Sequence, residues 1–387
     1  MPYVFAIDGG GTQSRSILLT DAGRVIHFAK GPGVNYHDIG AGNAAATIRR
    51  MFNEALTAAR ARREECRGIC LGLAGVGRDQ DRKILKPLFD DHFGAESYLL
   101  ISDAEVALVA GTLSEFGMIV IAGTGSIIFG RSEHGGEGRI GGYGPLLSDE
   151  GSGYRIALEG LRSVIRHVDG FRSGTMLQNL LYEELGVKTV DEFVHWVNNH
   201  GVAREKVAAL APLVLKAASD NDIVAAEILS DQADYLALGV DTLHKRLNFH
   251  DRFEVVLSGG LFAESSFYRQ IVRRKIMYLL PGADVVTPRI EPVLGSALYA
   301  YSIAGINLNE DLLDTIRRSF HEYMKTYSDK KPDHEMTLSA NNVKELVRKQ
   351  EQENERARDE ALQAEPIVPS EPVHEEAQLP QGKQGMV

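Results

Sequence analysis

Two short glycine-rich segments carry residues that could bind a phosphate group. The first is AIDGGGTQSRS, residues 6–16, and the second is AGTGS, residues 122–126; Thr12 and Thr124 are 112 positions apart. Backbone N–H groups at a glycine-rich tip can point at phosphate oxygens, and a threonine hydroxyl adds a donor. Both segments are therefore candidates for a nucleotide site.

The first segment matches neither common phosphate loop. It lacks the lysine of a Walker loop, and it opens a hairpin where a dinucleotide fingerprint would open a helix. Asp8, on the preceding strand, would repel phosphate unless a cation lay between them, so it is a candidate partner for Mg²⁺, usually through water. A simple Asp-Gly turn is the alternative interpretation.

Asp103 is a candidate general base. It follows a predicted strand, Ser97–Ile101, and begins a predicted helix, residues 102–111. Ligands of open α/β sheets bind at the carboxyl ends of strands, and a carboxylate there could accept a proton from a substrate hydroxyl. Ser102 and Glu105 also fit a capping box, which would only satisfy the start of the helix. The two roles are compatible.

Further polar and glycine-rich loops could contact a sugar or a nucleoside. The segment GGYGPLLSDEGSGYRIA, residues 141–157, offers the carboxylates of Asp149 and Glu150, and Asn35 offers an amide. Such groups suit the several hydroxyls of a sugar, although acids in the loop before a helix could equally face solvent. The loop SGG, residues 258–260, could let an adenosine approach the backbone, or could be an ordinary strand-to-helix turn.

Composition limits the class of protein. With 387 residues, two domains plus appendages are expected. The net charge of −11 argues against a nucleic-acid partner bound through a broad basic surface. Cys66 and Cys70 are the two cysteines, too few for a structural zinc site or a disulfide framework. No apolar run is long enough to span a membrane, and MPYVFAIDGG lacks the features of a signal peptide, so a cytoplasmic location is predicted.

The pattern of apolar residues predicts a duplicated α/β unit. Strands are expected at Tyr3–Ile7, Ser14–Thr20 and Val25–Ala29, before alternating helices and strands up to residue 111. From residue 118 the order of apolar strand, Gly/Thr/Ser turn, apolar strand and Gly-rich turn repeats. Two such units facing each other across a cleft are the economical interpretation. The second becomes mostly helical; one of its predicted helices spans residues 204–218.

These motifs together resemble the N-acetylglucosamine kinase and BadF/BadG/BcrA/BcrD ATPase family, within the superfamily of sugar kinases, actin and heat-shock chaperones. The resemblance covers roughly residues 3–305, and its most specific parts are the two hairpins at this separation and the GG-aromatic-G…DEGS segment. It implies an α/β fold of two ribonuclease H-like lobes with an interlobe cleft. The boundaries expected are 1–115 for an N-terminal actin-like ATPase lobe, 116–305 for a C-terminal lobe with a helical insertion, 306–327 for an accessory helix, and 328–387 for a charged tail, helical or disordered.

The resemblance also implies roles for individual residues. Asp8 would lie near Mg²⁺, and Asp103 would be the general base that activates a sugar hydroxyl. The residues implied to bind ATP are Gly10, Gly11, Thr12, Thr124, Gly125, Gly259 and Gly260, the last two beside the adenosine. Those implied to contact the sugar are Asn35, Gly142, Tyr143 and Asp149, in addition to Asp103; Tyr143 stands where many relatives carry Trp.

The activity implied is ATP-dependent phosphorylation of an amino sugar, N-acetylglucosamine above all, at its 6-hydroxyl, by a homodimer. Glucosamine and N-acetylmuramic acid are alternative substrates. A redox activase with a [4Fe–4S] cluster is another branch of the family, but its cysteines lie beyond the second hairpin, where this chain has none. An ATP-responsive module without kinase activity is the third interpretation.

Overall fold

A computed structural model describes residues 2–94, 97–200, 203–249 and 252–329 of the chain. The chain as far as Glu322 forms one compact unit, and the residues from Tyr323 form a second. Nearly all of the predicted tail, 328–387, lies outside the described residues. The boundary predicted between residues 115 and 116 stays a prediction, because both sheets belong to the same compact unit.

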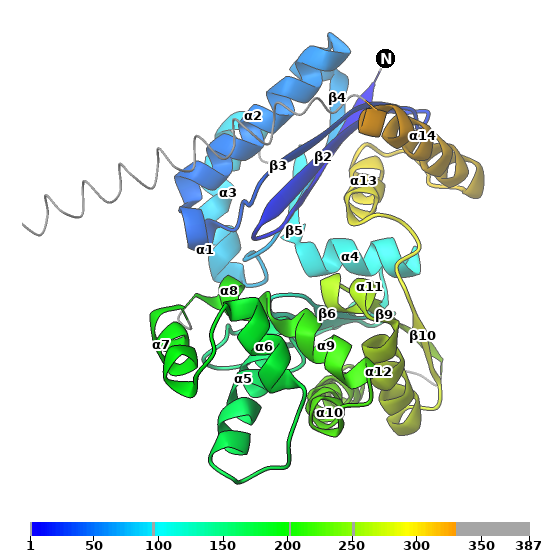
Figure 1. The fold of residues 1–387 in the computed structure, drawn as a ribbon. Coiled ribbons are helices and arrows are strands. Elements are labelled where there is room, and N and C mark those ends of the chain that lie inside the picture. Colours follow the sequence, from blue (N-terminus) through cyan, green and yellow to red (C-terminus); the bar gives the residue numbers. More distant parts are fainter. Residues whose placement is uncertain (1, 95–96, 201–202, 250–251, 330–387) are drawn as a thin grey trace, which may run out of the picture. The chain divides into compact units, whose positions relative to one another are not determined.

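The first sheet has five strands in the order β3-β2-β1-β4-β5 (Figure 1). Strand β1 lies at its centre, antiparallel to β2 and parallel to β4. The strands are β1 (Tyr3–Gly9), β2 (Gln13–Thr20), β3 (Val25–Pro32), β4 (Cys66–Leu73) and β5 (Tyr98–Ser102).

The second sheet repeats this arrangement, with the order β10-β9-β6-β7-β8. Strand β6 takes the place of β1, antiparallel to β7 and parallel to β9. The strands are β6 (Gly117–Ala122), β7 (Ser126–Arg131), β8 (Glu137–Gly141), β9 (Phe253–Ser258) and β10 (Ala283–Val286). The predicted α/β fold class with a duplicated unit is therefore confirmed, and both glycine-rich segments connect antiparallel strands.

Helices cover both faces of the first sheet (Figure 1). Helices α1 (Tyr36–Ile39), α2 (Ala41–Ala59) and α3 (Asp79–Phe93) lie on one face, because the apolar positions of α2 recur at helical spacing and pack on β1, β2 and β4. On the other face α13 (Pro292–Ile303) crosses β1 and β4. The Ser296 hydroxyl of α13 donates to the carbonyl of Ile7, 2.9 Å away.

Helix α4 (Asp103–Thr112) is apolar on all sides after its first turn, as expected for a helix buried on all sides. Ala107 and Leu108 pack against Ile119 and Val256 of the second sheet. The same helix contacts α13 and strand β4 of the first sheet. Helix α4 is thus packed between elements of the two sheets, and its first residue is Asp103.

The other helices follow the second sheet in the chain, and most pack on its outer face. They are α5 (Gly153–Val168), α6 (Leu177–Leu185), α7 (Val190–His200), α8 (Arg204–Ala208), α9 (Ala211–Ser219), α10 (Ile223–Leu247), α11 (Gly260–Glu264) and α12 (Ser266–Leu279). No described helix is long and apolar enough to cross a membrane.

Two parts of this region differ from the sequence-based expectation. The single helix predicted over 204–218 is two helices, α8 and α9, because Pro212 has no N–H to donate and is tolerated in a first helical turn, where α9 begins. Helix α12 and strand β10 were not predicted. Strand β10 has four residues, which is too short for periodicity to identify.

The accessory helix predicted over 306–327 is observed as α14 (Glu310–Asp329). Its residues in the first unit pack against the β2–β3 hairpin: Ile316 is fully buried, the N–H of Val25 donates to the Ser319 hydroxyl at 2.9 Å, and the Phe28 and Phe320 rings lie 5.7 Å apart. In the second unit the Tyr323 and Tyr327 rings stack.

Gly295 sets the distance between α13 and α4. A Cβ atom at Gly295 would lie 2.5 Å from the carbonyl oxygen of Val106 and 3.1 Å from the amide of Ala110, so the backbones would have to separate. We expect Gly295→Ala to lower the free energy of unfolding by about 1–3 kcal/mol. At Gly42 of α2 a Cβ meets open space, so the control Gly42→Ala should be neutral or slightly stabilising. Equal losses in urea denaturation of the two variants would contradict the proposed role of close helix packing.

Candidate active site

The predicted phosphate residues of the first hairpin lie at the carboxyl edge of the first sheet. Asp8 is near the end of β1, and the N–H of Gly10 donates to the carbonyl of Gln13 at 3.0 Å, which closes the turn. Gly11 and Thr12 are exposed at the tip. The hairpin therefore presents backbone and a hydroxyl to solvent, as an anion site requires.

Asn35 lies beside this hairpin. The N–H of Val34 donates to the carbonyl of Gly10 at 3.0 Å, and the Asn35 side chain accepts from the N–H of His37 at 3.2 Å, which caps α1. A Cβ atom at Gly75, in the loop after β4, would lie 2.4 Å from Asn35 Oδ1. The ends of β1, β3 and β4 thus converge on Asn35.

Asp103 follows β5 at the same edge and is the first residue of α4. The predicted capping box is present: Glu105 accepts from the N–H of Ser102 at 2.8 Å, and the N–H of Glu105 donates to the Ser102 hydroxyl at 3.2 Å. One oxygen of Asp103 accepts from the N–H of Ala104 at 3.0 Å. Because Ser102 and Glu105 form the cap, the Asp103 carboxylate is free for another role.

Burial raises the pKa of Asp103 to about 6. The pKa of Asp8 is also raised to about 6, first by burial and then by the charge of Asp103, although Arg15 acts to lower it. Two neighbouring carboxylates with raised pKa values are typical of functional sites and favour a bound cation. The described residues hold no cluster of three metal-ligating side chains. A site for Mg²⁺ with one carboxylate and otherwise phosphate and water ligands fits these residues.

The second hairpin is fixed to the start of α5. The N–H of Gly123 donates to the carbonyl of Gly125 at 2.9 Å and closes the turn. The N–H groups of Gly153 and Tyr154 donate to the carbonyls of Gly123 and Thr124, at 2.8 and 3.2 Å. Thr124 and Gly125 are therefore held in a rigid turn.

Gly259 lies against this turn. Its φ is +106°, and a Cβ atom would come within 2.3 Å of the carbonyl oxygen of Ala122, so glycine is required there. Gly260 is exposed and begins α11. The structure thus brings the two residues predicted beside the adenosine to the second hairpin.

Tyr143 carries two contacts that sequence reasoning missed. The residue is 51% exposed, and its ring lies near two guanidinium groups, with Arg139 5.2 Å and Arg78 5.8 Å from the ring centroid. Arginine over an aromatic ring is an attractive arrangement. Its neighbour Gly142 donates its N–H to the carbonyl of Ser126 at 3.1 Å. Because Arg78 precedes α3 and Tyr143 follows β8, this contact joins the two halves of the predicted site.

Asp149 is buried beside the second hairpin, with 1% of its surface exposed. Its Oδ2 lies 2.9 Å from Nη2 of Arg204, and its Oδ1 accepts from the N–H of Ser126 at 3.3 Å. Burial raises the pKa of Asp149, and Arg204 opposes this effect. Arg204 was not predicted, because its distance of 55 positions from Asp149 gives no local sequence signal.

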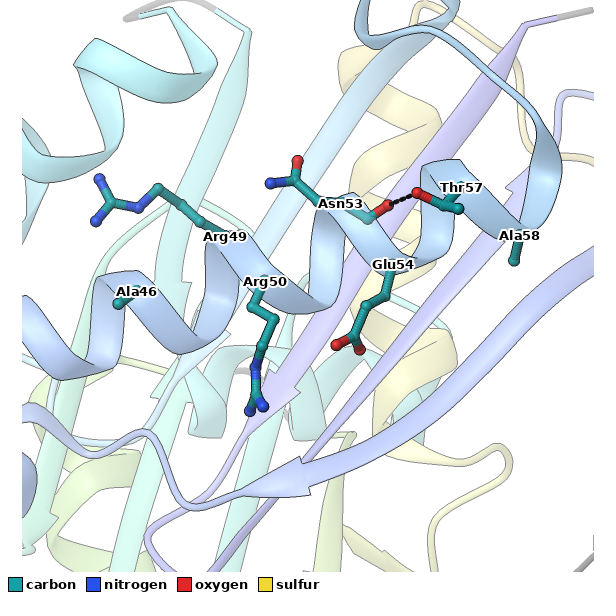
Figure 2. Close-up of a pocket in the computed structure, with 7 residues that line it drawn as sticks. All are labelled: Ala46, Arg49, Arg50, Asn53, Glu54, Thr57 and Ala58. Carbon is teal, nitrogen blue, oxygen red and sulfur yellow. Dashed lines mark hydrogen bonds between the residues drawn. The ribbon is translucent and has the colours of Figure 1, made fainter.

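A separate hollow of about 670 Å³ lies along the outer side of α2. Figure 2 shows the residues that line it, all from this one helix: Ala46, Arg49, Arg50, Asn53, Glu54, Thr57 and Ala58. None of the predicted site residues lines it, and it contains neither a glycine-rich turn nor a pair of acids. The candidate active site therefore lies at the sheet edges and not in this hollow.

Comparison with known proteins identifies relatives along most of the chain. The model of the BadF/BadG/BcrA/BcrD ATPase family matches residues 6–300. The N-acetyl-D-glucosamine kinase of Dictyostelium discoideum is 32% identical over 306 residues, which cover 76% of this chain and 96% of that protein. The N-acetylmuramic acid/N-acetylglucosamine kinase of Clostridium acetobutylicum is 28% identical over 305 residues, or 78% of this chain and 99% of that one.

A solved structure from Chromobacterium violaceum shares the fold, with a TM-score of 0.63 and 23% identity over 78% of this chain and 99% of that chain. This match confirms the fold of two mixed five-stranded sheets. The two kinases thus align to about three quarters of this chain and to nearly their own full length.

The raised pKa of Asp103 predicts a pH-dependent effect on stability. Between about pH 4 and 6 the folded protein binds a proton on Asp103 more tightly than the unfolded chain does. The stability that this bound proton contributes is therefore lost as the pH rises through 6. We expect Asp103→Asn to raise the free energy of unfolding by about 1–3 kcal/mol at pH 8 and by less at pH 4.5. Urea denaturation at both pH values measures this. The exposed Asp79, also first in its helix, gives the control Asp79→Asn, and an equal pH effect in both variants would contradict the prediction.

Proposed function

Because the chain belongs to the BadF/BadG/BcrA/BcrD ATPase family, we propose that it is an ATP-dependent kinase that phosphorylates an amino sugar, N-acetylglucosamine in the first instance, at its 6-hydroxyl. The two curated relatives described above are named as amino sugar kinases, and they support this choice. N-acetylmuramic acid and glucosamine are the alternative acceptors.

The position of Asp103 carries the proposal. It is a partly buried carboxylate at the carboxyl edge of the sheet that also carries the GGGT hairpin, and its pKa is about 6. Such a group is ionised at neutral pH and basic enough to accept a proton from a hydroxyl as the new bond to phosphorus forms. Asn35, where the ends of β1, β3 and β4 converge, would offer a polar group to the sugar.

The chain's other residues would mainly position the reactants. In this proposal the tip at Gly10, Gly11 and Thr12 binds ATP phosphates from one side, and Thr124 with Gly125 binds from the other. Asp8 would hold Mg²⁺, which neutralises charge on the phosphates when bound. Gly260, which has no neighbouring atom at the position of a Cβ, would leave the backbone open to the adenosine, and Gly259 would hold this loop against the second hairpin. Asp103 takes the 6-hydroxyl proton, the oxygen bonds to the γ-phosphorus, and ADP leaves.

A specific observation favours N-acetylmuramic acid as a second acceptor. This sugar carries a carboxylate on its lactyl ether, and Arg78 and Arg139 place two cations beside the ring of Tyr143, a residue proposed to contact the sugar. Arginine recognises carboxylates through charge-assisted hydrogen bonds. N-acetylglucosamine and glucosamine have no such group for these cations to bind.

The interpretations as a redox activase and as an ATP-responsive module without kinase activity have less support. Cys66 and Cys70 are both buried in strand β4 of the first sheet, and burial raises the pKa of Cys66 to about 12. Such thiols are poor ligands for a cluster between subunits. A module without kinase activity would not need a base such as Asp103 beside the hairpin.

A screen of ADP release tests the kinase proposal. The wild-type protein should release ADP with N-acetylglucosamine, and Asp103→Asn should lower kcat by about 10²–10⁴-fold while sugar binding survives. In the wild type kcat/KM should fall as pH drops below about 6, because the base becomes protonated. Asp79→Asn is the control and should keep normal turnover. No ADP release with any amino sugar would refute the proposal, and near-normal turnover of Asp103→Asn would refute the base assignment.

The acceptor preference has its own test. We expect Arg78→Gln or Arg139→Gln to raise KM for N-acetylmuramic acid about tenfold and to change KM for N-acetylglucosamine by less than about twofold, because only the first sugar has a carboxylate. The measurement is a pair of saturation curves for each variant. Equal changes for both sugars would mean that the arginines only support the loop.

A further inference from the structure

Asp81 is a buried carboxylate that takes no part in the proposed phosphoryl transfer. It is 4% exposed and belongs to the first turn of α3. Its Oδ2 accepts from the N–H of Arg78 at 3.0 Å, a bond expected of an acid at the start of a helix. Its Oδ1 has contacts that capping does not require: it accepts from the Tyr36 hydroxyl at 2.6 Å and lies 3.4 Å from Nε2 of His37. This second oxygen therefore connects α3 to α1.

Helix α1 determines how the side chain of Asn35 is held. Asn35 Oδ1 accepts from the N–H of His37 at 3.2 Å, and its Nδ2 donates to Asp38 Oδ2 at 2.7 Å. Because α1 has only four residues, its own hydrogen bonds cannot keep it folded, and it depends on contacts with its neighbours. Burial, and next the bond to Asp81, raises the pKa of Tyr36 to about 12, so the hydroxyl remains a donor at neutral pH. The orientation of Asn35 thus depends on the bond between α1 and α3.

The loop between β4 and α3 lies between the predicted sugar contacts of the two halves. At its start, a Cβ atom at Gly75 would lie 2.4 Å from Asn35 Oδ1, so the loop backbone closely approaches this amide. At its end, the guanidinium of Arg78 lies 5.8 Å from the centroid of the Tyr143 ring. The N–H of Arg78 is the group that donates to Asp81. One buried carboxylate therefore fixes both α1 and the end of this loop.

We propose that Asp81 is a positioning residue for sugar binding, which holds Asn35 and the β4–α3 loop in the arrangement that receives the sugar. It acts through the hydroxyl of Tyr36 on one side and through the N–H of Arg78 on the other. This inference rests on the proposed function in that the ligand is an amino sugar. A loop that is ordered before the sugar arrives loses less conformational entropy on binding, so the effect falls on sugar affinity.

Sugar binding and turnover, measured separately, test this role. By calorimetry, Asp81→Asn should raise Kd for N-acetylglucosamine about tenfold and change Kd for a non-hydrolysable ATP analogue by less than about twofold, because the amide offers one acceptor oxygen in place of two. In the kinase assay, KM for the sugar should rise while kcat at saturating sugar stays within about threefold, as expected when binding alone is weakened.

Tyr36→Phe is the milder variant, and it decides the test if Asp81→Asn does not fold. It removes one hydrogen bond from a buried ring, and we expect it to raise Kd for N-acetylglucosamine about threefold to tenfold. If both residues act through the same bond, combining Tyr36→Phe with Asp81→Asn should cause little further loss of sugar affinity.

Tyr98→Phe is the matched control. Tyr98 donates to Asp90 at 2.7 Å, so this variant removes a tyrosine–aspartate bond from the same helix, near its other end. It should bind both the sugar and the ATP analogue as the wild type does. A loss of sugar affinity equal to that of Tyr36→Phe would mean that any weakening of α3 has this effect, and it would overturn the inference.

Two other results would also overturn it. They are normal sugar binding by Tyr36→Phe, and an equal loss of sugar and analogue binding, which would mean that the carboxylate only stabilises the fold. The kinase proposal fails differently: a wild-type protein whose sugar binding depends on Asp81 but which transfers no phosphate would refute the proposed function alone.

Discussion

The buried charge of Glu105 is the interaction on which the arrangement of the site depends. This carboxylate is 3% exposed, and it lies 2.7 Å from Arg131 of β7 and 3.3 Å from Arg82 of α3. Tyr299 of α13 accepts a hydrogen bond from the same Arg131. A buried carboxylate is tolerated only with such partners, and loss of one typically costs 3–5 kcal/mol. Since Glu105 also caps α4, elements from both sheets fix the helix that begins with Asp103.

The carboxylates at the site, in contrast, destabilise the folded state. Asp8 and Asp103 raise the free energy of the ligand-free protein when both are ionised, and Arg15 compensates only in part. The neighbouring Glu291 adds to the repulsion felt by Asp8. Sites that bind cations and move protons commonly carry such a cost, which a bound ligand removes.

Much of the fold followed from local patterns in the sequence. The GGGT and GTGS segments were placed at hairpins because apolar strands flank them, and the equal strand orders confirm the repeat. The capping box of Ser102 and Glu105 was also recognised from the sequence, and it is present at the start of α4. Short or irregular elements were missed, such as β10, and the break before Pro212 was not recognised.

Predictions about the site were limited by long-range contacts. The glycines and Asp103 lie in recognisable local sequence patterns, so they could be identified as candidates from the sequence. Their roles stay predictions. Arg204 and Arg78 act through partners distant in the chain, and a single sequence does not reveal such pairs. The burial of Asp149 could not be predicted for the same reason, because an acid before a helix has the same local sequence pattern whether it faces solvent or an arginine.

The return of α13 to the first sheet has a consequence for synthesis of the chain. The helix supplies Ser296 to the backbone of β1, and Gly68 of β4 leaves room for the carbonyl of Ala300. Ser102 ends the first sheet, and Pro292 begins α13, 190 residues later. At roughly 5–20 residues per second, the ribosome takes on the order of 10–40 s to make that stretch. During this time one apolar face of the nascent first sheet lacks its cover, and it is the surface on which a chaperone would act.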